Sequence, residues 1–158
     1  MKKILLNFVL FFSFCLLQVA LPGNFFNKPL PDFLLLFLIV SFFLVPKNYF
    51  FILLLIRGLL FDSLSGLGWG VNLATLFLSF LVGFLLTFVF EQNNVFSRLL
   101  IGESILALYY FFFGCFSFLI GRQIVGLPLL IIDFALNGFL YWLIIFTQIH
   151  VFQKKIHY

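Results

Sequence analysis

Charged residues are scarce in this sequence, in which aspartate, glutamate, lysine and arginine make up 9% of 158 residues. A typical soluble domain has about 25% charged residues, and these cover its surface with polar groups. A chain in which 65% of residues are hydrophobic cannot build such a surface. The composition therefore predicts an all-α protein, a polytopic transmembrane helix bundle in a lipid bilayer. Residues 1–158 are expected to form a single integral membrane domain.

Cysteine and histidine are also rare, with two of each, and no spacing typical of a metal site. Cys15 and Cys115 lie in apolar runs, where cysteine behaves as a small hydrophobe, so we expect no disulfide, metal or cofactor. An HExxH pattern, paired carboxylates on one helix and a phosphate-binding loop with a lysine are all missing. We therefore expect a protein that is not an enzyme. No basic cluster is long enough to follow a nucleic-acid backbone, which excludes nucleic acid as an expected partner.

Long apolar runs are what the chain has instead, and a membrane-spanning helix needs about 20 such residues, with 17–25 common. The runs that we interpret as spans cover residues 4–21, 32–45, 49–64, 71–90, 99–120 and 128–147. The first run follows two lysines and could be mistaken for a signal peptide. A cleavage site after Ala20 would place Gln18 where a small residue is required, so we expect an uncleaved first helix.

The second and third runs are short, and merging them into one span over residues 33–56 would leave five crossings. That alternative places Lys47 near mid-bilayer, at a cost of about 2.5–3.5 kcal/mol. With six spans and both termini in the cytoplasm, the inner basic residues are Lys2, Lys3, Lys47, Arg98, Lys154 and Lys155, and the outer ones are Lys28 and Arg122. Five spans would place four basic residues on each side. Because basic residues collect on the cytoplasmic side, this distribution favours six spans.

A few charged residues lie inside the apolar runs, where a charge is costly and normally has a partner in the bundle interior. Arg57 is near the middle of the third run. Asp62 lies five residues further on, on a different face of the same helix. Glu103 and Asp133 are on the fifth and sixth runs, and depth alone allows Arg57 to reach either. We favour a buried pair that fixes the helix arrangement over a proton or solute path, because the acids occur singly on separate helices.

Two polar residues stand at the predicted starts of helices. Asp32 follows Pro31 at the start of the second run, where a carboxylate caps unpaired backbone N–H groups, and capping is sufficient to explain it. Asn72 follows a glycine-rich turn and is expected to cap the fourth helix.

The residues around these two positions form a recognisable pattern. LPDFLL begins at residue 30, and RGLLFDSLSGLGWGVN occupies residues 57–72. The pattern resembles the bacterial rod shape-determining family MreD, in which Pro-Asp opens an apolar helix and Asp-x-x-Ser-Gly and Gly-x-Asn follow. The match covers about residues 31–72, and the second half of the chain agrees in hydropathy and length. The segment before Asp62 has fewer glycines than is usual in that family.

The resemblance implies a non-enzymatic, multi-pass scaffold in the bacterial cytoplasmic (inner) membrane that helps to determine rod shape. Members of that family work with MreC, alongside MreB and a peptidoglycan synthase made of RodA and a penicillin-binding protein. The family has no known catalytic residues. Asp32, Asp62, Ser65, Gly66 and Asn72 match its pattern and are expected to shape the bundle or a face that binds a partner.

Two alternative functions remain open from the sequence, and the weaker is a membrane-embedded lipid enzyme, which would need clustered carboxylates or histidines that this chain lacks. Substrate-binding membrane subunits of small-solute, vitamin-type importers are also six-helix proteins of similar size, and likeness of fold does not settle function. Such a subunit would have a pocket with converging polar groups.

Overall fold

A computed structural model describes residues 9–10, 12–13, 32–65, 70–91, 94–120 and 127–154. Within these ranges the elements in chain order are α2 (Phe33–Leu44), α3 (Lys47–Ser65), α4 (Val71–Val89), α5 (Val95–Leu119) and α6 (Leu127–Lys154). The all-helical class predicted from the sequence is confirmed for this part of the chain. Residues 9–10 and 12–13 are helical too, but the rest of the predicted span 4–21 lies outside the described residues.

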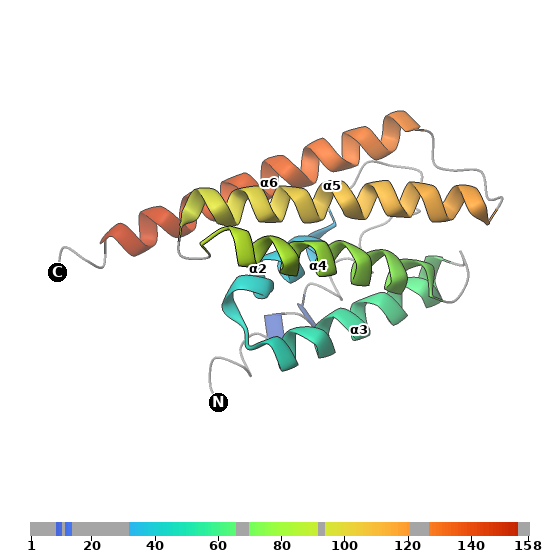
Figure 1. The fold of residues 1–158 in the computed structure, drawn as a ribbon, viewed down its shortest axis with the longest axis horizontal. Coiled ribbons are helices and arrows are strands. Elements are labelled where there is room, and N and C mark those ends of the chain that lie inside the picture. The colour runs from blue at the N-terminus through green and yellow to red at the C-terminus, as the bar shows by residue number, and fades with distance from the viewer. Residues whose placement is uncertain are drawn as a thin grey trace.

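The helices from α3 onwards form a layer of neighbours that alternate in direction (Figure 1). The short α2 packs against α3, α5 and α6. Among the described residues, three segments are long and apolar enough to cross a membrane, namely Val71–Val89, Val95–Leu119 and Pro128–Thr147. These three apolar helices indicate a membrane protein.

The distribution of side chains agrees with this class. Phe88, Phe118 and Leu119 are each about three-quarters exposed, with values of 74%, 74% and 76%. Arg57 and Asn137, in contrast, are both 0% exposed. Soluble proteins bury most large apolar side chains and almost never bury an arginine fully unless it is paired. An apolar exterior, with the buried charged and polar groups enclosed in a mainly apolar core, suits helices surrounded by hydrocarbon.

The chain turns sharply between α2 and α3. Val45 has an extended backbone, with φ −109° and ψ 144°, and its N–H donates to the Ser41 carbonyl. Pro46 has no N–H with which to continue the helix, and its carbonyl accepts from the N–H groups of Tyr49 and Phe50. The second and third runs therefore form two helices, and not the single helix over residues 33–56 that the alternative topology requires.

The length of α2 changes the depth expected for its first residue. Its 12 residues measure about 18 Å at 1.5 Å per residue, whereas the hydrocarbon core is about 30 Å thick. The helix alone is too short for the full crossing that the run 32–45 predicted. Its N-terminus therefore lies beside Arg57, near the midpoint of the 19-residue α3.

Two other helix boundaries differ from the sequence prediction. Asn94 caps α5 by accepting the Phe96 N–H at 3.0 Å, so that helix begins at Val95 and contains Arg98. At the other end of the chain, α6 continues to Lys154, since neither proline nor glycine interrupts residues 139–154. The residues after 147, predicted as a tail, extend the helix beyond its neighbours (Figure 1).

The contact between α5 and α6 depends on a glycine. A Cβ added to Gly102 would lie 2.2 Å from the ring of Tyr141, which is fully buried. The Tyr141 hydroxyl donates to the carbonyl of Arg98 at 2.7 Å, which holds the ring across the helix interface. Small residues at such points let two membrane helices approach closely. Gly102 is therefore a packing requirement of this interface.

Gly102→Ala is expected to lower the free energy of unfolding by about 1–3 kcal/mol, because the added methyl forces Tyr141 out of place. Gly114→Ala on the same helix is the matched control, since the nearest atom to its added Cβ is 3.8 Å away. The measurement is reversible unfolding of the purified protein in detergent. Equal stability of the two variants would contradict this account of the interface.

A buried polar cluster as the candidate functional site

An ion pair joins α3 to the start of α2. Nη2 of Arg57 donates to Oδ2 of Asp32, and the two side chains are 0% and 13% exposed. An arginine in this setting needs a counter-charge, because removing a charge from water costs several kcal/mol. We predicted a buried pair and left its acid open between Glu103 and Asp133, but the partner in the structure is Asp32. The short α2 brings Asp32 to the depth of Arg57.

Asp32 also caps α2, as predicted. Its Oδ1 accepts the Leu35 N–H at 2.8 Å, while its own backbone N–H donates to Oδ1 of Asn137 at 2.9 Å. One carboxylate oxygen thus serves the helix end and the other serves Arg57. The interpretation that capping alone explains Asp32 was wrong, since the residue connects α2 to both α3 and α6.

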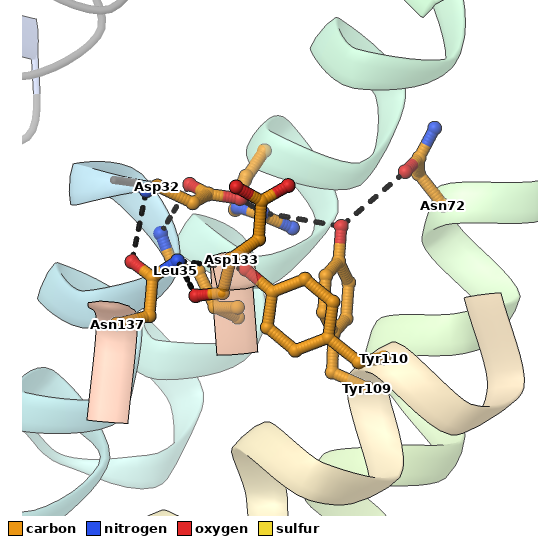
Figure 2. A network of polar contacts seen from close by, with 8 residues as sticks. Asp32, Leu35, Asn72, Tyr109, Tyr110, Asp133 and Asn137 are labelled. Carbon is orange, nitrogen blue, oxygen red and sulfur yellow. Dashed lines mark hydrogen bonds and ion pairs between the residues drawn. The ribbon is translucent and has the colours of Figure 1, made fainter. Parts of the chain in front are cut away.

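Aromatic residues surround the guanidinium. Its central carbon lies 4.5 Å from the ring centroid of Phe61 and 5.1 Å from that of Tyr109, within the range of cation–π attraction. Nη2 of Arg57 also lies 3.4 Å from the Tyr109 hydroxyl, and that hydroxyl donates to Oδ1 of Asn72 at 3.5 Å (Figure 2). Nε and Nη1 make no hydrogen bond within the described part of the chain, so the rings are a second source of stabilisation for the cation.

Asp62 holds the start of α4 from outside that helix. Its carboxylate accepts the N–H groups of Gly70, Asn72 and Leu73 at 2.9, 2.7 and 3.3 Å. A carboxylate in this position satisfies free donors at a helix start and faces the positive end of the helix dipole. Gly70, the residue before the helix, has a φ of +97° and provides no side-chain cap. The prediction that Asn72 caps α4 was wrong, because Asp62 takes that role and the Asn72 side chain points to Tyr109.

Asn137 connects α6 to the same cluster. Its Nδ2 donates to the Tyr110 hydroxyl at 2.7 Å and to the backbone carbonyl of Asp133 at 2.8 Å. Figure 2 shows Asp133 and Asn137 on α6, with Tyr110 beside Tyr109 on α5. Oδ1 of Asp133 is buried and makes no hydrogen bond among the residues described. Asp133 thus enters the cluster through its main chain.

The remaining predicted residues lie elsewhere. Glu103 is on the face of α5 that meets α6, where its Oε2 would be 3.0 Å from a Cβ added to Gly138. Gly66 and the side chain of Ser65 fall outside the described residues. The structure therefore brings together Asp32, Arg57, Asn72 and, through the backbone of α4, Asp62.

Sequence reasoning missed three members of the cluster, Tyr109, Tyr110 and Asn137. Phenylalanine outnumbers tyrosine 28 to 5 in this chain, so a tyrosine inside an apolar run is a signal that its hydroxyl has a partner. The amide of Asn137 in the middle of a long apolar helix is a similar signal, because polar groups at that depth face the bundle interior.

The cluster joins side chains from the five helices α2 to α6. Most of its hydrogen bonds connect one member of the cluster to another. Its side chains are two acids, one arginine, two tyrosines and two asparagines, and Asp133 takes part through its main-chain carbonyl. Across the described ranges, no three histidine, cysteine, aspartate or glutamate side chains meet in a way that could hold a metal ion. The chemistry that this arrangement supports is the neutralisation of buried charge and the fixing of helix positions.

The class that fold and cluster define is an all-helical membrane protein with an internal ion pair. Comparisons of the chain with models of known families, with curated proteins and with solved structures found no match.

Arg57→Met is expected to lower the free energy of unfolding by about 3–5 kcal/mol, because it leaves the Asp32 carboxylate buried without its counter-charge. Asp32→Asn removes the same pair from the other side and keeps a good capping residue. The double variant should lose less than the sum of the two single losses, measured by unfolding in detergent. Glu103→Gln is the control, an acid on a neighbouring helix whose removal leaves the pair intact. Strictly additive losses would mean that the pair does not stabilise the fold.

Asp62→Asn is expected to cost about 1–2 kcal/mol, since an amide offers one acceptor oxygen where the carboxylate offers two. Backbone amides 70–73 should exchange hydrogen faster, as measured by mass spectrometry in detergent. Ser63→Ala removes an exposed neighbouring hydroxyl whose bond stays within α3, to the Leu59 carbonyl, and serves as the control. A similar acceleration in both variants would exclude a specific role for Asp62.

Proposed function

We propose that this chain is a non-enzymatic membrane scaffold of the bacterial cell-wall elongation complex, of the MreD kind, and that it helps to determine rod shape. The proposal begins from the motifs shared with that family over residues 31–72. Its main support is that the described motif residues Asp32, Asp62 and Asn72 are all used in structural contacts between helices. Residues that shape a bundle are what a scaffold without catalytic chemistry is expected to preserve.

We propose six membrane segments with both termini in the cytoplasm. The distribution of basic residues supports this orientation. The alternating directions of α3 to α6 (Figure 1) bring the first residue of α3 and the last turn of α6 to the same end of the bundle, which supports a common side of the membrane for Lys47 and Lys154. In this topology α2 covers part of the second crossing, and its C-terminal end lies towards the cytoplasm.

The proposed mechanism is the presentation of fixed surfaces within the membrane. The polar cluster holds the helices in one arrangement, while large apolar side chains such as Phe88, Phe111 and Phe139 are exposed on the outside. Apolar surfaces of this kind offer packing contacts to partner helices in a bilayer. The proposed direct partner is MreC, with MreB, RodA and a penicillin-binding protein reached through the complex, in the cytoplasmic membrane.

Depletion of the protein in the bacterium that makes it is expected to turn rod-shaped cells into spheres. Re-expression of the wild type or Glu103→Gln should restore rods, and Arg57→Met should not, because it weakens the bundle that the partners bind. Cell shape is scored by microscopy, and the amount of each tagged variant in the membrane is measured in parallel.

Unchanged cell shape after complete depletion would contradict this proposal. Recovery of a small metabolite in equal proportion with the purified protein would instead support the importer alternative.

A further inference from the structure

A cavity lies at the end of the bundle where α2 turns into α3. Its volume is about 220 Å³, and residues of α2, α3 and α4 line it. Seven of its eleven lining residues are phenylalanines, so its wall is mainly aromatic and apolar. One cation, Lys47, is among these eleven residues, and none of them is acidic.

The ammonium group of Lys47 is held at this cavity. Its Nζ lies 4.2 Å from the ring centroid of Phe84, a cation–π contact across α3 and α4. Lys47 is also the first residue of α3, and the start of a helix carries a partial positive charge. The C-terminal end of α2 lies at the same turn and offsets that partial charge, so the positive charge at the rim of this apolar cavity is that of the Lys47 ammonium.

We propose that this cavity binds an anionic phospholipid, with the phosphate at Lys47 and part of one acyl chain among the phenylalanine rings. Both halves of such a molecule match the site, the charge at its rim and the apolar wall below. In the proposed orientation Lys47 faces the cytoplasmic leaflet, where anionic headgroups attract basic residues and basic pockets between helices bind them.

A second cavity in the described structure differs from the first in the charge of its lining. It lies between α5 and α6, has a volume of about 550 Å³, and has no charged residue among those lining it. An apolar cavity of that kind accepts any acyl chain, whereas the one at Lys47 distinguishes lipids by the charge of their headgroup.

Native mass spectrometry of the full-length protein in a non-denaturing detergent tests the proposal. Phosphatidylglycerol and phosphatidylcholine are added at equal concentration, and the bound fraction of each is measured. The wild type is expected to retain phosphatidylglycerol preferentially. Lys47→Gln should reduce its retention ~5-fold, the factor that corresponds to about 1 kcal/mol for one basic residue. Lys154→Gln removes the same charge from the last residue of α6, a helix that contributes no residue to the described lining of the cavity, and should leave the preference unchanged.

Leu81→Trp tests the apolar half of the site. Leu81 lines the cavity and is 45% exposed, so a larger side chain can enter the cavity from its edge without disturbing the core. This variant should reduce the retention of both lipids. Circular dichroism and thermal unfolding confirm that each variant is folded.

Equal retention of the two lipids by the wild type would overturn the proposal without the need for any variant. It would also fail if Lys154→Gln reduced retention as much as Lys47→Gln, or if the wild type retained no lipid because another segment or a second copy fills the cavity. None of these results bears on the proposed role in cell shape, which the depletion experiment tests separately.

Discussion

The arrangement of the helices depends on how one arginine is neutralised inside an apolar bundle. Arg57 has no exposed surface, and its counter-ion Asp32 stands at the start of a different helix. The pair can form only if α2 and α3 run side by side in opposite directions, which the turn at Pro46 allows. The backbone N–H of Asp32 then binds Asn137 on α6, and Tyr109 links the arginine to Asn72. A single buried charge thus draws groups from all five described helices into one network.

Much of the fold follows from the sequence by simple rules. Apolar runs become helices because helices satisfy all their backbone groups internally, and the chain breaks at Pro46 because proline cannot continue a helix. The burial of Arg57 was also predictable from its position within an apolar run. Its partner was not, because the depth of Asp32 depends on the length of α2 and on how that helix packs against α3. These are tertiary properties, and residue order along the chain does not contain them directly.

The cap of α4 shows the same limit at a smaller scale. A local rule assigns a cap to the nearest suitable side chain, and Asn72 is the nearest. The structure uses Asp62, which belongs to the preceding helix and accepts from three backbone donors at the start of α4. Asn72 is then available to accept from Tyr109. A charged cap from a neighbouring helix also fixes the angle between the two helices. A cap from the helix's own first turn cannot do this.

Helices in a bilayer gain little from burying apolar surface against each other, since lipid tails are as apolar as their side chains. Close packing and polar contacts must therefore hold such a bundle together, and this chain uses both. Gly102 lets α5 and α6 approach closely. The network around Arg57 joins α2, α3 and α4 to these two helices. Both devices face inward, so the outer apolar faces are not needed to hold the fold. Those faces are free to meet other helices or lipid, which is the property that the proposed scaffold role requires.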